Sequence, residues 1–216
     1  PGVEISVTWR DSTVHIVGVG IDPNSKDLTD GLDSVSGSRL RRGIAIAEEL
    51  RRVGIDGTLD AAITLAKDSR SLSRAHFARV LVEKGYAADT KSVFHRFLAR
   101  GKPGYVPHQW ATLENAVRWI SAAGGVAVIA HPGRYAFSDE EAHAFLSQFR
   151  ELGGKGVEVL TGSHTPQQAR KFAEISKKYK LKASCGSDFH GPNESRIDLG
   201  RLPELPGELE PVWDCL

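Results

Sequence analysis

The feature that most limits the fold of this chain is a regular alternation of helix and strand patterns over its second half. Three amphipathic segments, each opened by a capping residue, alternate with three short apolar runs. The expected helices cover 112–123, 138–152 and 165–179, and the expected strands cover 126–130, 156–160 and 181–185. Such alternation predicts parallel strands covered by helices, in either a barrel or an open doubly wound sheet.

The first part of the chain has a different pattern. Residues 3–8 and 14–19 predict two strands, joined by a hairpin-like turn at Asp11-Ser12. The polar, Gly- and Ser-rich stretch 22–38 predicts a loop. The segment that follows has the apolar spacing of consecutive helices, with Thr58, Ser73 and Thr90 as expected caps. We therefore expect one α/β domain made of residues 1–38 and 111–216, with residues 39–110 inserted as a helical subdomain.

The net charge and the cysteine content limit the classes of binding partner and the compartment that we expect. The net charge is +1 over 216 residues, so no global field attracts nucleic acid or membranes, and any anion binding has to be local. No apolar run reaches the length of a membrane span. Cys185 and Cys215 form no C-x-x-C motif, which favours a reducing cytoplasm. We expect neither a membrane nor a stable duplex nucleic-acid partner.

Side chains of the metal-binding type interrupt or follow the predicted strands. His131 comes directly after one strand, and Asp188 and His190 follow another with one residue between them. Glu4 and His15 lie within the two N-terminal strands. Carboxylate oxygens and neutral imidazoles together suit Zn²⁺, Mn²⁺ or Fe²⁺. The alternatives are that Asp188 caps a turn, that His190 lies on the surface and that Glu4 faces water.

Several segments resemble the metal motifs of the PHP (polymerase and histidinol phosphatase) family. They are Pro-Gly-Val-Glu-Ile-Ser at 1–6, Val-His-Ile-Val-Gly at 14–18, Ala-His-Pro-Gly-Arg-Tyr at 130–135 and Gly-Ser-Asp-Phe-His at 186–190. His-Phe-Ala-Arg at 76–79 and the segment 99–107 resemble the bacterial subgroup with 3′,5′-nucleotide bisphosphate phosphatases and a 5′-to-3′ exoribonuclease. The resemblance covers nearly the whole chain.

This resemblance implies a fold and a set of metal ligands. The implied fold is a distorted (β/α)7-type barrel of the amidohydrolase-like kind, with the helical insertion near its mouth. The implied ligands are Glu4, His15, His131, Asp188 and His190. They would hold two or three divalent ions, with Mn²⁺ expected first and Zn²⁺ or Fe²⁺ as alternatives.

The sequence departs from the family pattern at its beginning. The family starts with a D-x-H-x-H stretch and a further metal-binding His, whereas this sequence has no H-x-H. It also contains no Met and is strand-like from its third residue. We therefore expect that the opening βα units of the barrel, with their ligands, lie upstream of Pro1.

Other residues are candidates for binding the substrate. Arg134 lies three residues after His131, and a guanidinium pairs bidentately with phosphoryl oxygens; the alternative is an ordinary surface arginine. Four residues of the insertion are candidates for phosphate or base contacts, with solvated surface or packing as the alternative: His76, Arg79, Lys102 and Tyr105. Glu158 could support the metal ligands from behind, and His164 could approach the site.

The resemblance implies a metal-dependent phosphoesterase. The implied substrates are 3′,5′-bisphosphonucleotides, which would lose the 3′-phosphate, and short 5′-phosphorylated RNA cut from its 5′ end. One alternative is another phosphatase of the family, acting on a small metabolite such as histidinol phosphate. The other is a non-catalytic PHP-like module that binds nucleic acid or a partner without turnover.

Overall fold

A computed structural model describes residues 1–107, 110–190 and 197–216. The chain divides into two compact units. The sheet unit comprises Pro1–Gly31 and Trp110–Leu216, and the helical unit comprises Leu32–Gln109. Within the described ranges, no helix combines the length and the apolar character needed to cross a bilayer.

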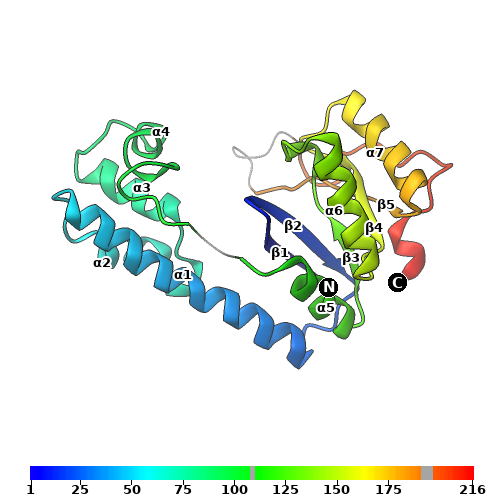
Figure 1. Cartoon of the computed structure of the whole chain (residues 1–216), viewed down its shortest axis with the longest axis horizontal. Coiled ribbons are helices and arrows are strands. Elements are labelled where there is room, and N and C mark those ends of the chain that lie inside the picture. Colours follow the sequence, from blue (N-terminus) through cyan, green and yellow to red (C-terminus); the bar gives the residue numbers. More distant parts are fainter. Residues whose placement is uncertain (108–109, 191–196) are drawn as a thin grey trace. The chain divides into compact units, whose positions relative to one another are not determined.

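The sheet unit is built on five strands in the order β1-β2-β3-β4-β5 (Figure 1). Their bounds are Gly2–Trp9 for β1, Ser12–Val19 for β2, Val126–Ile129 for β3, Gly156–Thr161 for β4 and Lys182–Gly186 for β5. The β1–β2 and β2–β3 pairs are antiparallel, and the β3–β4 and β4–β5 pairs are parallel. The expected hairpin and the expected parallel strands are thus confirmed, within one mixed sheet. Trp9 pairs with Ser12, so that Arg10, at φ 50°, and Asp11 form the turn, one residue earlier than predicted, and Ser12 belongs to β2.

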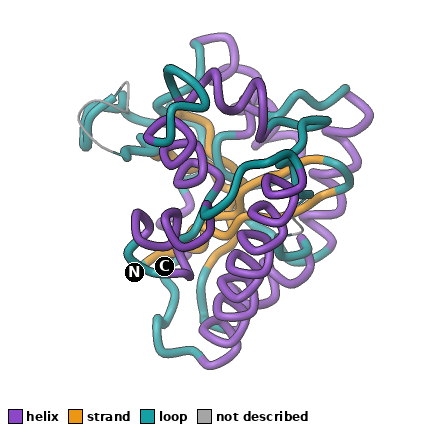
Figure 2. Tube along the Cα trace, turned by 90° about the vertical axis from the view of Figure 1, so that its left-hand side faces the viewer, coloured by secondary structure: helices purple, strands orange, loops and turns teal. Residues whose placement is uncertain are grey.

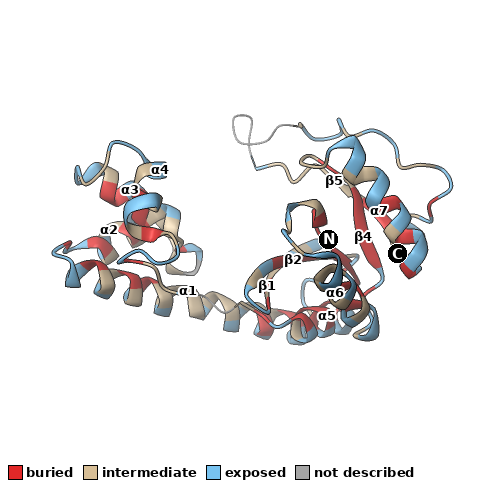
Figure 3. Ribbon diagram, turned by 45° about the horizontal axis from the view of Figure 1, so that its top comes forward, coloured by how far each residue is buried: buried red, intermediate tan, exposed pale blue. Residues whose placement is uncertain are grey.

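Three helices cover one face of this sheet: α5 (Leu113–Ala122), α6 (Asp139–Glu151) and α7 (Pro166–Tyr179). The predicted caps form in all three, with Thr112 accepting from the Asn115 amide and capping boxes at Ser138 and Thr165. Side chains of α6 and α7 close over the end of β3 around a small apolar cavity. In Figure 3, β4 is coloured as buried along nearly its whole length, as expected for a central parallel strand.

The alternation along β1 decides on which face the polar residues lie. Ile5, Val7 and Trp9 are buried, and Trp9 packs against Phe145 of α6 with ring centroids 5.1 Å apart. Since successive side chains of a strand point to opposite faces, Glu4 lies on the face away from α6. The first and last residues of the chain lie side by side (Figure 2): the Gly20 amide donates to the Pro1 carbonyl, and Leu216 packs over Gly20.

The helical unit packs its helices around a core of its own that includes Leu50, Phe77, Leu81 and Leu98. Its helices are α1 (Lys26–Arg52), which begins in the sheet unit, α2 (Thr58–Ala66), α3 (Arg74–Glu83) and α4 (Thr90–Val93), and α4 continues as a π-helix over Phe94–Leu98. Short 3₁₀ turns occupy Ser69–Ser71, Pro132–Arg134 and Val212–Cys215. Ser73 caps α3 as predicted, whereas the N-cap positions of α2 and α4 are Gly57 and Asp89 rather than Thr58 and Thr90.

The predicted loop over 22–38 is wrong, because α1 begins at Lys26 and continues through this stretch. Leu28 is 1% exposed, and a side chain at Gly31 would come within 2.4 Å of the Trp119 ring. The small residues that suggested a loop therefore allow the helix to approach α5 closely. This packing against a distant segment outweighs the low helix propensity of Gly and Ser.

Candidate metal centre

Three predicted ligands meet on the face of the sheet away from α6. His15 Nδ1 lies 2.7 Å from Glu4 Oε1, and His131 Nε2 lies 3.3 Å from the same oxygen. One potential ligand atom from each residue lies within 4.8 Å of the other two. The two imidazole rings contact each other edge-on, with centroids 5.0 Å apart. The arrangement therefore presents two nitrogens and one carboxylate oxygen to one point.

Strand pairing explains this meeting. Glu4 is opposite Val17, and Ser6 is opposite His15, so Glu4 and His15 occupy diagonal positions on the same face of the hairpin. The Ala130 amide donates to the His15 carbonyl at 3.1 Å, which places His15 level with the end of β3. His131 is the next residue, and its left-handed backbone, at φ 29°, turns the chain out of the strand.

The residues fit a divalent transition metal. Hydrogen bonds from His131 and from His15 hold the pKa of Glu4 well below its usual range, so this carboxylate is ionised. The His131 side chain is 5% exposed, and its Nδ1 is buried without a hydrogen-bond partner among the described residues. The other ring nitrogen, Nε2, faces the ionised Glu4 carboxylate at 3.3 Å, and an imidazole nitrogen beside a carboxylate oxygen is the type of donor pair that Zn²⁺, Mn²⁺ or Fe²⁺ binds.

Tyr135 links the two strands that carry the histidines, a role that the sequence analysis missed. Its hydroxyl accepts a hydrogen bond from the His15 amide and donates one to the Ala130 carbonyl, both at 2.8 Å. Burial raises the pKa of Tyr135, so the phenol stays neutral and can donate. Its position in the segment Ala-His-Pro-Gly-Arg-Tyr was the one available signal in the sequence.

Glu158 of β4 lies directly behind His131. Its Oε2 accepts from the His131 amide at 2.5 Å, and the residue is 8% exposed. Burial raises the pKa of Glu158 to about 7, and the neighbouring Glu4 and Asp188 carboxylates add to this effect. A side chain at Gly186 would come within 2.5 Å of Glu158 Oε1, so the glycine leaves the space that this carboxylate occupies.

Asp188 and His190 lie at the end of β5, outside the three-residue cluster formed by the described residues. Arg134 Nη2 is 2.6 Å from Asp188 Oδ2, and Arg134 Nε donates to Ser163 Oγ at 3.0 Å. His190 Nδ1 lies 2.8 Å from the Asp188 carbonyl. The Asp188 side chain is 12% exposed, and that of His190 is 63% exposed. The predicted ligand set thus divides into a cluster of three and an adjoining Asp-His pair held by Arg134.

The other predicted substrate residues belong to the helical unit, and their contact with a substrate stays a prediction. They are His76, Arg79, Lys102 and Tyr105. His76 Nδ1 accepts from the Ser73 amide, so this side chain also caps α3. Arg42 of α1 donates from Nε and Nη2 to the Val106 carbonyl, and burial lowers its pKa to about 10.

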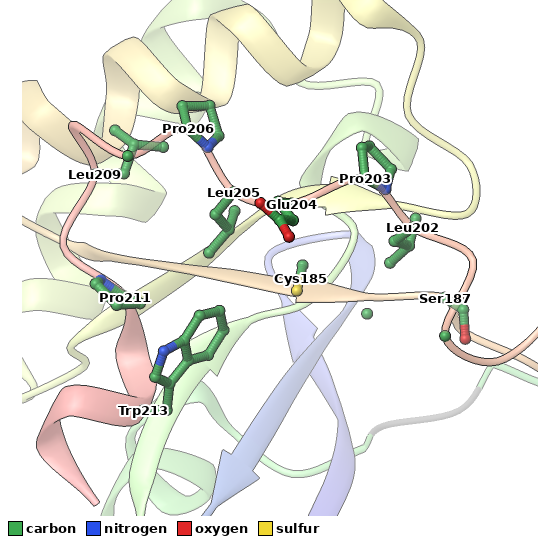
Figure 4. Close-up of a pocket in the computed structure, with 13 residues that line it drawn as sticks. Cys185, Ser187, Leu202, Pro203, Glu204, Leu205, Pro206, Leu209, Pro211 and Trp213 are labelled. Atoms are coloured by element: carbon green, nitrogen blue, oxygen red, sulfur yellow. The ribbon is translucent and has the colours of Figure 1, made fainter.

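A large hollow lies beside β5, and none of the three cluster residues lines it. Figure 4 shows it between β5 and the segment that ends in Trp213. Its volume is about 650 Å³. Leu202, Leu205, Leu209 and Trp213 contribute apolar surface, and no imidazole occurs among its described lining residues. This hollow therefore lacks the imidazole donors of the candidate metal centre, although Glu204 offers a carboxylate.

Comparison with known proteins shows which family the chain is similar to. No protein-family model matches the chain. The chain is 46% identical to the 3′,5′-nucleoside bisphosphate phosphatase of Chromobacterium violaceum over 98% of its own length and 74% of that protein. It is 42% identical to the 5′-3′ exoribonuclease Rnm of Salmonella typhimurium over 99% of its own length and 72% of that protein.

Solved structures show the same similarity. An amidohydrolase from Chromobacterium violaceum, with bound sulfate and no metal, superimposes with a TM-score of 0.85 at 46% identity. This match covers 99% of the present chain and 74% of that one. A protein of Bifidobacterium adolescentis described as a metal-dependent phosphoesterase superimposes with a TM-score of 0.73 at 25% identity. That second match covers 99% of the present chain and 73% of the other.

Proposed function

This chain belongs to the PHP family, in the subgroup of 3′,5′-nucleoside bisphosphate phosphatases and 5′-3′ exoribonucleases, and on that premise we propose that it is a metal-dependent phosphoesterase. The observation that carries the proposal is the meeting of Glu4, His15 and His131 at the end of β3. These donors suit a divalent metal, and the relatives that share the chain's sequence act on phosphate esters by name.

We propose that Glu4, His15 and His131 hold one divalent ion and that Asp188 and His190 contribute to the same centre. The centre would hold two or three ions, with Mn²⁺ expected first. When bound, such ions polarise a phosphoryl oxygen and lower the pKa of a bound water. The protein's own contribution is to keep the Glu4 carboxylate ionised and to fix the backbone amides of His15 and His131 through Tyr135 and Glu158.

The proposed substrates are 3′,5′-bisphosphonucleotides and short 5′-phosphorylated RNA. Such a substrate carries one phosphate to be cleaved and another to be recognised, and the second needs a cation at a set distance. We assign this role to Arg134, because its guanidinium lies against Asp188, a proposed ligand, and its side chain is 45% exposed. The parallel order of β3, β4 and β5 also supports a distorted barrel of the (β/α)7 type.

The test uses the protein expressed from its natural reading frame. Metal is removed with a chelator, and Mn²⁺, Zn²⁺ or Fe²⁺ is added back separately. Phosphate release is then measured with adenosine 3′,5′-bisphosphate and with histidinol phosphate, and nucleotide release with a 5′-phosphorylated oligoribonucleotide. We expect activity on the bisphosphate or the RNA that is lost with the metal and restored by at least one ion.

Two outcomes would contradict the proposal. Activity on histidinol phosphate alone would indicate a phosphatase for small metabolites. Absence of turnover on every substrate, with nucleotide binding retained, would indicate a non-catalytic module.

A further inference from the structure

The turn that follows β3 carries a proposed metal ligand and a phosphate-binding candidate only three residues apart. His131 precedes the short 3₁₀ turn Pro132–Arg134, and Arg134 ends it. Between them, both backbone groups of Gly133 are bonded by side chains. His164 Nε2 accepts from the Gly133 amide at 3.0 Å, and Gln168 Nε2 donates to the Gly133 carbonyl at 2.8 Å. The turn is therefore held at its middle by residues that follow β4.

His164 is itself fixed in one orientation. Its Nδ1 donates to the Val159 carbonyl at 2.9 Å, and its ring stacks on Phe172 at 5.0 Å with an angle of 20° between the planes. One nitrogen faces a carbonyl and the other an amide, so the ring is neutral with its proton on Nδ1. Because both nitrogens are used, His164 is not a metal ligand in this arrangement.

Gln168 joins the turn to the start of α7. Its Oε1 accepts from the Thr165 amide at 2.8 Å as the capping-box partner, which leaves the amide group free to donate to Gly133. The capping box therefore orients the Gln168 side chain, and this side chain donates to the Gly133 carbonyl.

The contact leaves no space at Gly133. A side chain there would meet His164 Cδ2 at 2.7 Å and Gln168 Nε2 at 2.8 Å. Only glycine lets the turn lie this close to the two side chains. Gly133 therefore packs closely against both His164 and Gln168.

We propose that His164 and Gln168 are positioning residues that fix both backbone groups of Gly133 and, through them, the directions of the His131 ring and the Arg134 guanidinium. This inference rests on the proposed function, in which His131 binds metal and Arg134 binds phosphate. The two hydrogen bonds to Gly133 would then set the distance between the metal and the recognised phosphate. Residues that orient metal ligands in this way change metal affinity by about ten- to a hundredfold when they are lost.

The experiment compares three variants of the protein expressed from its natural reading frame. His164→Phe can stack on Phe172 but cannot accept from the Gly133 amide. His164→Gln offers an amide oxygen at a similar reach. Thr112→Ala removes the side-chain cap of α5, and Thr112 makes no bond to Gly133, so this variant serves as the control for lost stability.

Three quantities are measured: Mn²⁺ affinity by calorimetry, melting temperature, and the imidazole NMR signals of His131 in metal-free protein. We expect His164→Phe to lower Mn²⁺ affinity about tenfold or more and to shift the His131 signals. We expect His164→Gln to retain affinity within about threefold of the natural protein. Thr112→Ala should lower the melting temperature and leave the affinity and the His131 signals unchanged.

The inference is overturned if His164→Phe leaves the His131 signals where they were, or if Thr112→Ala shifts them equally. It is also overturned if His164→Gln loses as much affinity as His164→Phe. Neither calorimetry nor NMR requires turnover, so an inactive natural protein would refute the proposed function while these signals still decide the positioning role. If the natural protein binds no Mn²⁺, the NMR comparison alone decides.

Discussion

Arg134 and Asp188 form an ion pair across the end of β4, with Arg134 Nη2 2.6 Å from Asp188 Oδ2. Arg134 follows β3 and Asp188 follows β5, so the two residues belong to strands that flank β4 in the sheet. The pair fixes the guanidinium beside a proposed metal ligand. An anion bound by Arg134 would therefore lie close to the metal centre.

The first prediction concerns Arg134→Ala. Loss of one charge-assisted contact should cost about 1.5–3 kcal/mol of binding, or roughly ten- to a hundredfold in kcat/KM for a 3′,5′-bisphosphate. A monophosphate that lacks the recognised group should lose far less. The measurement is kcat/KM on both substrates, with the exposed Arg170→Ala as the matched control. Equal losses on the two substrates would place Arg134 at the reacting phosphate or in folding.

The second prediction concerns Asp188→Asn, which preserves shape and removes the charge. Turnover should fall by about a hundredfold or more, since a charge close to the reacting phosphate is lost. The melting temperature should change little, because Asp188 lies at a strand end outside the core. Turnover and bound metal are measured beside Asp214→Asn, which changes an exposed carboxylate. Full activity in Asp188→Asn would show that its pairing with Arg134 is only structural.

The third prediction concerns pH and Glu158. Its pKa is about 7 in the folded protein against an ordinary value of 4.5, so the folded state holds the proton more tightly. The stability from this group is complete below pH 4.5 and is lost as the pH rises through 7. In metal-free protein, the free energy of unfolding decreases as the pH rises. This decrease should be smaller by up to about 3 kcal/mol in Glu158→Gln. Urea unfolding at pH 5 and pH 8 measures this decrease in the free energy of unfolding. A decrease in Glu158→Gln equal to that of the natural protein would refute the prediction. The exposed Glu151→Gln is the control.

The fourth prediction concerns Gly186→Ala. The added Cβ would meet Glu158 Oε1 at 2.5 Å, so the carboxylate has to move away from the His131 amide. The variant should be destabilised by about 1–3 kcal/mol and should bind metal more weakly. Gly207→Ala is the matched control, because a Cβ there meets nothing within 4 Å. Equal unfolding free energies for the two variants would contradict the close packing of Gly186 against Glu158.

Local signals were sufficient for most of the elements. The caps at Thr112, Ser138 and Thr165 and the apolar spacing after each of them predicted α5, α6 and α7 to within a residue or two. Local signals did not predict the start of α1, because the contact that stabilises the helix there involves a residue far away in the sequence. Gly31 belongs in a helix because the Trp119 ring packs against it, and nothing near Gly31 in the sequence indicates that ring.

The sequence by itself determined the chemical types of the site: carboxylates and imidazoles at strand positions, and a glycine-containing turn between His131 and Arg134. Only the tertiary structure decided which of them meet. Glu4 and His15 share a face because of the hairpin register, and His131 joins them because β3 pairs with β2 at the level of His15. A shift of one residue in either pairing would turn these side chains to the opposite face. The register between β2 and β3 depends on packing between segments far apart in the sequence, so residue types and spacing along the chain do not specify it.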